Sequence, residues 1–464
     1  MNHPREYRGK EIVILGLARS GVAAAKLFHQ MGAKVIVNDK KERSACPEAE
    51  ELEALGISVV CGSHPDTLIQ PGITLVVKNP GIPYTVEPIR KAEQLGIEVV
   101  TEVEVAYRFC KAPMIGITGS NGKTTTTTLI GLMLAAGGLT PIVAGNIGRA
   151  LTEAAQKAAP SDWMVVELSS FQLKGTREFR PRIGCLLNAY ETHLDYHGTM
   201  EDYVASKAKM FENQTHEDTA VLNWDDPVCR SLADGIQARL LPFSMKESLT
   251  YGVYLDIPAN ALVYRNEQGT QHFILPAHEM GIPGSYNIEN ALAASAAAIA
   301  AGVEPSVLGE VLRSFRGVEH RLELVRKYEG VTYYNNSKAT NPAATIKSIE
   351  AFDQSVVLIA GGLDRGSDYM ELLPVFRERV KGIVTLGQTR EKINRVAELA
   401  GISLIKTVDT ANDAADAVAQ AVLAAKQMSG DKDIVLLSPA CASWDMFPSY
   451  EDRGRMFKES VHNL

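Results

Sequence analysis

The stretch MIGITGSNGKTT, residues 114–125, constrains the fold of this chain more than any other. Its first four residues are mostly apolar and predict a short buried strand, and Lys123 begins a helix that we expect to end near Ala136. Glycines at positions 116, 119 and 122 let the intervening backbone turn tightly and approach a ligand closely. The free N–H groups and the positive dipole end of the helix then point at the turn, which predicts a phosphate-binding loop.

This loop predicts an ATP site in which the turn and the lysine hold phosphates and the next hydroxyl binds Mg²⁺. The predicted nucleotide-binding residues are Gly119, Ser120, Asn121, Gly122, Lys123, Thr124 and Thr125, with Thr124 as the metal ligand. The spacing departs from the usual P-loop pattern because no glycine stands five residues before Gly122. A glycine-rich turn with an exposed lysine is the alternative. Nucleotide binding is favoured because strand, glycines, Gly-Lys-Thr and helix coincide.

The N-terminal segment shows a strand, a turn, a helix and a second strand. Glu11–Leu15 is the first strand, a turn with glycines at both ends follows, and Ala33–Asn38 is the second strand, ending beside Asp39. This layout is similar to a dinucleotide-binding unit, but Ala18 occupies the place of the middle glycine. Nucleotide binding and an ordinary strand–helix–strand turn therefore both stay open.

Two polar side chains follow buried strands after the phosphate loop. Glu167 stands near the end of a strand at Trp163–Leu168, and His193 follows a strand at Ile183–Asn188. Parallel strands place their carboxyl ends on one edge of a sheet, so both side chains can face the phosphates held by Lys123. Each alone would be interpreted as a surface glutamate or a loop histidine. Together, beside a phosphate loop, they predict magnesium ligands, since carboxylate oxygen is a natural donor.

The remaining chain again alternates strands with helices. Strands are expected at 330–335, 355–360, 382–386 and 433–437, which predicts a further parallel sheet. We therefore expect an α/β protein of three domains: a Rossmann-like domain at 1–101, a central doubly wound domain of the P-loop ATPase type at 102–317, and a Rossmann-like C-terminal domain at 318–464.

Composition excludes several classes of function. A net charge of −8 argues against a nucleic-acid partner, because a phosphate backbone selects basic surfaces. The six cysteines form no C-x-x-C pair, which favours reduced thiols and a cytoplasmic location. The most apolar helix, near Ala291–Val303, is too short for a membrane span, so no membrane insertion is expected.

Six motifs, spread in order over the chain, resemble those of the Mur ligases. They are Gly119–Thr124, Gly145–Gly148, Glu167–Gln172, His320-Arg321, the segment NSKATN at Asn336–Asn341 and the segment SPACAS at Ser438–Ser443. The last two are similar to the branch that adds D-glutamate. A folylpolyglutamate synthase is the nearest rival, but that family lacks an N-terminal domain of about a hundred residues. A regulatory ATP-binding module without ligase chemistry is a second rival. The chain argues against it because it retains all of the reactive residues Lys123, Glu167, His193, Lys207 and Lys338.

The resemblance implies roles that spacing alone does not. The implied catalytic residues are Lys123, Glu167, His193, Lys207 and Lys338, with Thr124, Glu167, His193 and a carbamylated Lys207 binding two Mg²⁺ ions. Further nucleotide contacts fall on Asn287, Asn290, Arg321 and Asn336. Ser20, Asp39 and Asn79 are implied to bind the UDP end of the substrate, and Asn146 is implied to lie near the reacting groups. The implied D-glutamate pocket is formed by Thr340, Arg365, Ser443, Trp444 and Tyr450.

The implied substrates are ATP, UDP-N-acetylmuramoyl-L-alanine and D-glutamate. The implied ligase of peptidoglycan synthesis cleaves ATP and joins the other two through an acyl phosphate, and we expect it to be a monomer. Three positions depart from the family pattern. Asn336 stands where aspartate is usual, Tyr286 replaces a histidine before Asn287, and Arg365 replaces a lysine of some members. The last change keeps the charge and offers a planar, bidentate partner for a carboxylate. The base that deprotonates the incoming amine is not identified by these motifs.

Overall fold

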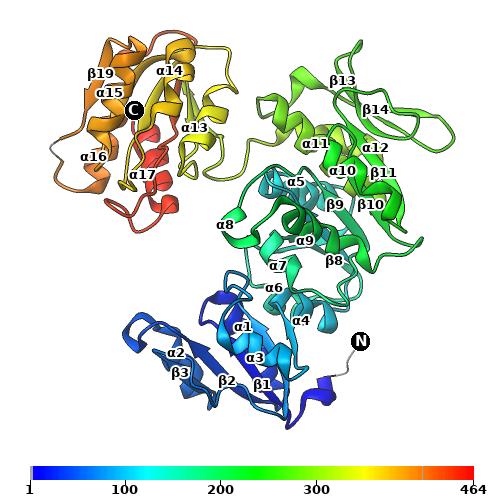
Figure 1. Cartoon of the computed structure of the whole chain (residues 1–464). Helices are drawn as coiled ribbons and strands as arrows, with labels where there is room; N and C mark the ends of the chain where they lie inside the picture. Colours follow the sequence, from blue (N-terminus) through cyan, green and yellow to red (C-terminus); the bar gives the residue numbers. More distant parts are fainter. Residues whose placement is uncertain (1–3, 410) are drawn as a thin grey trace. The chain divides into compact units, whose positions relative to one another are not determined.

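Three β-sheets organise the chain in the computed structural model, which describes residues 4–409 and 411–464 (Figure 1). The chain divides into two compact units, one built from residues up to 279 with 288–313 and the other from 280–287 with 314–464. The first unit contains two sheets and the second contains one. Each sheet lies within one of the three predicted domain ranges, whose limits stay predictions. The α/β architecture with three sheet-containing domains is as predicted.

The first sheet is parallel, with strand order β3-β2-β1-β4-β5, the order of a Rossmann fold. Alternate residues of β1 pack into two different hydrophobic cores. Ile12 and Ile14 belong to one core, and Val13 and Leu15 belong to the other. A strand that is buried on both faces explains the continuous apolar run in its sequence. The strands are β1 (Glu11–Leu15), β2 (Lys34–Asp39), β3 (Ser58–Cys61), β4 (Ile73–Lys78) and β5 (Glu98–Val100), and the helices are α1 (Arg19–Gln30), α2 (Glu48–Ala54) and α3 (Glu87–Gln94).

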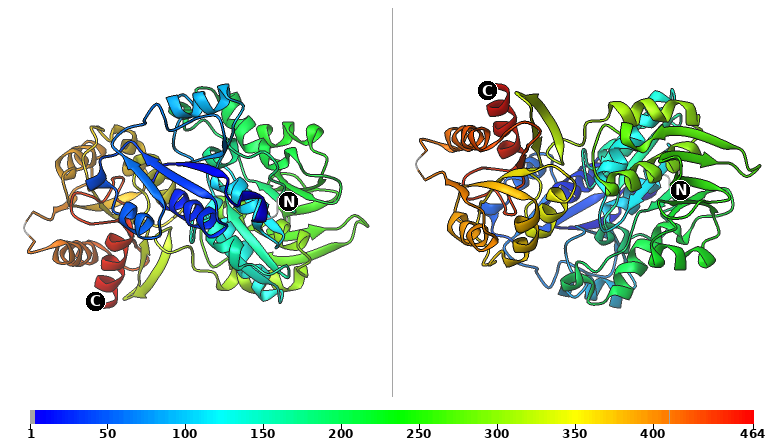
Figure 2. Two further views of the ribbon diagram at one scale, coloured as in Figure 1. Left: turned by 90° about the horizontal axis from the view of Figure 1, so that it is seen from below. Right: turned by 90° about the horizontal axis from the view of Figure 1, so that it is seen from above.

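The second sheet has nine strands in the order β14-β13-β12-β11-β10-β9-β6-β8-β7. They are β6 (Met114–Thr118), β7 (Thr140–Gly145), β8 (Asp162–Glu167), β9 (Ile183–Leu186), β10 (Thr219–Asn223), β11 (Arg239–Ser244), β12 (Gly252–Asp256), β13 (Ala261–Arg265) and β14 (Gln271–Pro276). The strands from β6 to β11 pair in parallel, as predicted, whereas β13 pairs antiparallel with both β12 and β14. This green ribbon, visible in Figures 1 and 2, was not foreseen from the sequence.

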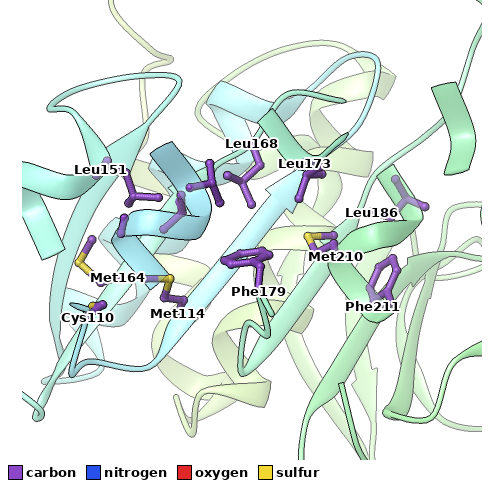
Figure 3. Packing of buried hydrophobic residues seen from close by; sticks show 14 of the residues in the cluster. Cys110, Met114, Leu151, Met164, Leu168, Leu173, Phe179, Leu186, Met210 and Phe211 are labelled. Atoms are coloured by element: carbon purple, nitrogen blue, oxygen red, sulfur yellow. The ribbon is translucent and has the colours of Figure 1, made fainter. Parts of the chain in front are cut away.

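Helices accompany this sheet along the chain. They are α4 (Glu102–Phe109), α5 (Lys123–Ala136), α6 (Leu151–Lys157), α7 (Ser170–Lys174), α8 (Leu194–His197), α9 (Met200–Glu212), α10 (Pro227–Ser231), α11 (Ser285–Ala300) and α12 (Pro305–Ser314). The core in Figure 3 joins Met114 and Met164 of the strands to Cys110, Met210 and Phe211. This packing fixes the strand ends that carry the predicted site. Among the described residues, no helix has both the length and the apolar character needed to cross a bilayer.

The third sheet has the order β15-β16-β20-β17-β18-β19, and only β15 pairs antiparallel. Its elements are β15 (Glu323–Tyr328), β16 (Val331–Asn335), β17 (Val356–Ala360), β18 (Val380–Thr385), β19 (Leu404–Thr407), β20 (Ile434–Leu437), α13 (Pro342–Ile349), α14 (Leu373–Arg379), α15 (Arg390–Ala400), α16 (Ala414–Met428) and α17 (Tyr450–His462). Short 3₁₀ helices lie at Pro4–Tyr7, Arg43–Ala45, Ala233–Gly235, Ala277–Glu279 and Met370–Leu372.

Candidate active site

The phosphate loop connects β6 to α5, as predicted from the sequence. Gly122 precedes the helix with φ of 83°, and a Cβ atom there would lie 2.2 Å from Asn290 Oδ1. Both the left-handed backbone and the close approach require glycine. Lys123 Nζ donates to the carbonyl oxygens of Gly119 (2.8 Å) and Ser120 (3.1 Å), so the ammonium group lies over the loop.

The loop is held from the neighbouring strand and helix. The Ser120 N–H donates to the Asn188 carbonyl at 3.1 Å, and the Asn121 N–H donates to Asn188 Oδ1 at 2.9 Å. Ser120 Oγ and the Tyr203 hydroxyl are 2.8 Å apart. These contacts hold the backbone in a turned conformation, which suits a loop whose N–H groups bind phosphate.

Glu167 lies at the carboxyl end of β8, beside the first turn of α5. Thr124 Oγ1 donates to Glu167 Oε2 at 2.8 Å, and Asn146 Nδ2 donates to Oε1 at the same distance. The glutamate is only 2% exposed. Glu167, Thr124 and Asn146, predicted separately from the sequence, therefore form one hydrogen-bonded cluster.

This cluster fits a hard divalent cation. Among the described residues, both hydrogen-bond partners of the Glu167 carboxylate are neutral, and no basic side chain is in hydrogen-bonding contact with it. A buried negative charge therefore stands next to the phosphate loop. Carboxylate and hydroxyl oxygens are the ligands that Mg²⁺ prefers. Among the described residues, no three His, Cys, Asp or Glu side chains are placed to hold a metal by themselves. The Thr124 hydroxyl and the phosphates of a bound nucleotide would complete such a site.

His193 and Lys207 lie in the segment that follows β9. His193 precedes the one-turn helix α8 in a left-handed conformation, φ 58°, and its ring packs against Phe171 (5.0 Å between centroids). Lys207, on α9, is 2% exposed. Its Nζ atom donates to Thr118 Oγ1 at 3.3 Å and lies 4.6 Å from the centre of the Tyr203 ring. Among the described residues, no carboxylate forms an ion pair with Lys207.

Electrostatic coupling shows that these groups share one environment. Burial, followed by the charge of Lys123, holds the pKa of Lys207 well below its usual value. The pKa of His193 is also lowered, first by burial and then by Lys123. Both shifts favour neutral forms, which for His193 is the form that binds a metal.

The three residues predicted for the UDP end surround the turn between β1 and α1. Ser20 Oγ donates to Asn79 Oδ1 at 2.8 Å, and Asp39 Oδ2 accepts from the Leu17 N–H at 2.8 Å. A Cβ atom on Gly16 would lie 2.4 Å from Asn79 Nδ2. The carboxyl ends of β1, β2 and β4 thus bring these side chains together, where open α/β sheets bind their ligands.

In the second unit, two pairs of predicted residues come together. Lys338 Nζ donates to the Tyr450 hydroxyl at 3.1 Å. The Arg365 guanidinium carbon lies 5.2 Å from the centre of the Trp444 ring, and Trp444 is 66% exposed. An exposed arginine over an exposed aromatic ring leaves the outer edge of the guanidinium accessible to an anion.

Other predicted residues of the second unit have mainly internal contacts. Asn336 is buried, and its amide donates to the hydroxyl groups of Ser348 and Ser438 while its Oδ1 accepts from the Leu322 N–H. Ser443 is buried and Thr340 is exposed. Arg321 precedes β15, and its N–H donates to the Val318 carbonyl at 2.8 Å. The nucleotide and D-glutamate contacts of these residues stay predictions, as does that of Asn287 on α11.

Three family profiles match the chain in order. The Mur ligase MurD-like N-terminal domain matches residues 10–101, the Mur ligase middle domain matches 117–298, and the Mur ligase glutamate ligase domain matches 320–441. A Geobacillus sp. (strain WCH70) protein named UDP-N-acetylmuramoylalanine--D-glutamate ligase is 50% identical over 459 residues, 99% of this chain and 98% of the relative. The chain belongs to the Mur ligase family.

Further relatives agree with this assignment. A protein of the same name from Geobacillus kaustophilus is 48% identical over 465 residues, which is 100% of both chains. The solved MurF structure from Acinetobacter baumannii has a TM-score of 0.61 at 18% identity and covers 97% of this chain and 93% of that one. MurF ligase from Thermotoga maritima, in complex with ADP, has a TM-score of 0.56 at 17% identity and covers 99% and 97%. These structures show that this Mur ligase has the fold of the family.

Several residues that support the site of this Mur ligase were not predicted from the sequence. Tyr203 and Asn188 fix the phosphate loop, and their placement at a helix start and a strand end gave no separate signal. Buried Arg453 joins two predicted motifs by donating to Ser337 Oγ at 3.0 Å and to the Cys441 carbonyl at 3.2 Å. Burial lowers the pKa of Arg453 to about 10. A buried arginine on a polar helix cannot be told from a surface one by pattern alone.

Proposed function

We propose that this Mur ligase joins D-glutamate to UDP-N-acetylmuramoyl-L-alanine while ATP is cleaved to ADP and phosphate. The observation that carries this proposal is the 50% identity, over 98% of its length, to a relative named for that activity. The buried Glu167–Thr124 pair beside the phosphate loop supports an ATP-dependent reaction with a divalent metal.

In the first step, the L-alanyl carboxylate attacks the γ-phosphorus of ATP, forming an acyl phosphate and releasing ADP. Both reactants are anions, so positive charge at the transferring phosphoryl group lowers the barrier. Lys123 supplies such a charge from the loop, and bound Mg²⁺ would supply more at Thr124 and Glu167. His193 is proposed to hold a second Mg²⁺, and Lys338 to contact the nucleotide.

In the second step, the amine of D-glutamate attacks the acyl carbon, the amide bond forms and phosphate leaves. Arg365 is proposed to bind the side-chain carboxylate of D-glutamate, with Thr340 and Ser443 adding hydroxyl donors. Fixing both carboxylates would aim the amine of one enantiomer alone at the acyl carbon. Ser20, Asp39 and Asn79 are proposed to hold the UDP end of the other substrate.

Lys207 is proposed to carry a carbamate, formed when its neutral amine adds to CO₂ and releases a proton. The buried amine has no ion pair among the described residues, and a carbamate would supply the oxygen ligands that Mg²⁺ prefers. A magnesium-loaded crystal grown with bicarbonate should show a planar group on Nζ. Density for an unmodified amine in such a crystal would contradict the carbamate.

Phosphate release from ATP tests the reaction itself. We expect release only when UDP-N-acetylmuramoyl-L-alanine and D-glutamate are both present, with L-glutamate failing to replace the D enantiomer. Efficient use of L-glutamate or L-lysine would point to another Mur ligase activity. Folyl-substrate turnover would favour the rival synthase, against which the match of residues 10–101 to a MurD-like N-terminal domain already argues.

We also propose that the enzyme acts as a cytoplasmic monomer. Its six cysteines are all unpaired in the structure, consistent with a reducing compartment. Sedimentation of the purified protein at its assay concentration tests the monomer.

A further inference from the structure

The one-turn helix α8 starts directly after His193 and is held from two sides. His197 is its last residue. Its Nε2 atom is hydrogen-bonded to Ser170 Oγ (2.9 Å) and its Nδ1 atom to Asp202 Oδ2 (2.7 Å). Ser170 and Asp202 belong to α7 and α9, so these contacts stay within the domain that carries the phosphate loop. A helix of four residues has too few internal hydrogen bonds to be stable alone, so outside contacts fix its position.

Tyr196, the preceding residue, instead reaches the N-terminal Rossmann-like domain. Its hydroxyl group lies 3.0 Å from the Pro80 carbonyl oxygen and 3.3 Å from the Ile82 carbonyl oxygen. Lys78 Nζ donates to the same hydroxyl at 3.3 Å and to the Pro80 carbonyl at 3.0 Å. A buried lysine and two carbonyl groups therefore converge on one tyrosine oxygen.

The turn that Tyr196 contacts carries a residue proposed to bind the UDP end. The Ile82 N–H donates to the Asn79 carbonyl at 3.0 Å, which closes a four-residue turn. Asn79 in turn accepts from Ser20 Oγ, at the start of α1. A ligand that orders Ser20 and Asn79 would thereby order the carbonyl groups to which Tyr196 donates.

Ring contacts continue from Tyr196 to the proposed metal ligand. The Phe171 ring lies 4.4 Å from that of Tyr196 and 5.0 Å from that of His193, between centroids. His193 itself has a left-handed backbone conformation, which a non-glycine residue adopts at a cost of about 1–3 kcal/mol unless its surroundings enforce it. The His193 ring is thus oriented by contacts that start at the N-terminal domain.

We infer that Tyr196 is a positioning residue that couples the nucleotide-sugar site of the N-terminal domain to the metal ligand His193. A bound UDP-sugar orders the turn at Asn79–Ile82, the turn holds Tyr196, and Tyr196 holds α8 so that His193 faces the metal. Because coupling between two sites is reciprocal, the metal must tighten UDP-sugar binding by the same factor. The inference rests on the metal site proposed above.

Calorimetry with a nucleotide-sugar that lacks the reacting carboxylate tests this coupling. UDP-N-acetylglucosamine carries the nucleotide-sugar end but no carboxylate, and its dissociation constant is measured in the presence of ADP, with Mn²⁺ or with EDTA. The ratio of the two constants should be about fivefold or more in the wild type, a typical size for coupled sites. Tyr196→Phe keeps the ring contact with Phe171 and should lower the ratio to about one.

Tyr84→Phe is the matched control, because it removes a hydroxyl group at the same interface that forms no hydrogen bond with the turn among the described residues. It should keep the wild-type ratio. Thermal unfolding of each variant checks that the fold is retained.

A wild-type ratio in Tyr196→Phe would overturn the inference, as would a ratio of one in the wild type while electron paramagnetic resonance shows protein-bound Mn²⁺. Failure of the wild type to bind Mn²⁺ under any condition would instead contradict the metal site, and the inference with it. These results separate an error about Tyr196 from an error about the proposed function.

Discussion

Glu104 and Glu167 are both buried carboxylates of the first unit, but their surroundings differ. Glu104, on α4, accepts from Arg108 Nε at 2.9 Å and from the backbone N–H groups of Arg177, Glu178 and Phe179 at 2.8–3.2 Å. In the part of the chain that the structure describes, Glu167 accepts only from the neutral side chains of Thr124 and Asn146. Glu104 thus has four donors, one of them a cation, whereas Glu167 has two neutral donors.

This difference separates a structural charge from a functional one. A buried carboxylate that is compensated by an arginine and three N–H groups ties α4 to the segment after α7, and contributes to stability. A buried carboxylate without a cationic partner beside a phosphate loop can bind a cation supplied by the ligand. The same contrast applies to the lysines, because Lys174 pairs with Asp202 at 2.6 Å and Lys207 has no such partner among the described residues.

Replacing Lys123 should have the largest effect on activity. Lys123→Ala removes a charge that meets developing negative charge at the phosphoryl group, so turnover should fall by about 10²–10³-fold or more. The melting temperature should stay near that of wild type, because the Lys123 ammonium group donates to carbonyl groups of its own loop rather than to a core. Coupled ADP production measures the loss. Lys209→Ala, which removes a surface lysine paired with Glu212, is the control and should retain full activity.

Removing the compensated carboxylate should act on stability instead. Glu104→Ala leaves Arg108 Nε and three backbone N–H groups without their acceptor, although Arg108 keeps its ion pair with Glu98. The free energy of unfolding should fall by about 3–5 kcal/mol. Urea denaturation measures this loss, with exposed Glu153→Ala as the control. A decrease below about 1 kcal/mol, the range of a surface ion pair, would show that Glu104 is not the structural charge described here.

Arg365 is a cation to which the same reasoning applies. It stacks on Trp444 and has no carboxylate partner among the described residues, so the D-glutamate side chain would supply one. Arg365→Ala should raise the KM for D-glutamate about tenfold or more, a loss of about 1.4 kcal/mol. The KM values for ATP and the UDP-sugar should not change. A rise of all three KM values together would assign Arg365 another role. The KM of Arg365→Lys for D-glutamate should lie between those of the wild type and Arg365→Ala, because lysine keeps the charge and loses the bidentate geometry.

Replacing Lys78 should leave the site itself unchanged and alter how stability depends on pH. Burial, followed by the charge of Lys174, lowers its pKa from 10.5 to about 7 in the folded protein. Between these values the unfolded chain holds the proton and the folded chain does not, so stability should rise with pH. The slope is at most about 1.4 kcal/mol per pH unit. Lys78→Met should flatten the dependence of unfolding free energy on pH from 7 to 10, and an unchanged slope would contradict the shifted pKa.

Much of this fold was predictable because local signals agreed with tertiary structure. The strand Glu11–Leu15 and the helix Lys123–Ala136 end where apolar pattern and glycine predicted. The antiparallel ribbon β12–β14 was missed because its strands are short, and the first three residues of β12 and of β13 are all buried, so they show no alternation.

The site was predictable to the extent that parallel strand ends converge. Glu167 and Thr124 were expected to face the same phosphates, and their side chains are hydrogen-bonded. Burial and partners were not predictable. Lys207 was expected to be like any solvent-facing lysine until the family resemblance, and Lys78 gave no signal at all, because a lone lysine at a strand end has the pattern of a surface residue.

Metal binding by paired carboxylate variants tests the central distinction most directly. Electron paramagnetic resonance would measure Mn²⁺ bound in the presence of ADP to the wild type, to Glu104→Gln and to Glu167→Gln. We expect Glu104→Gln to bind Mn²⁺ like the wild type, with lower stability as its only defect, and Glu167→Gln to lose the protein-dependent signal while melting at the wild-type temperature. Wild-type Mn²⁺ affinity in Glu167→Gln would contradict the account.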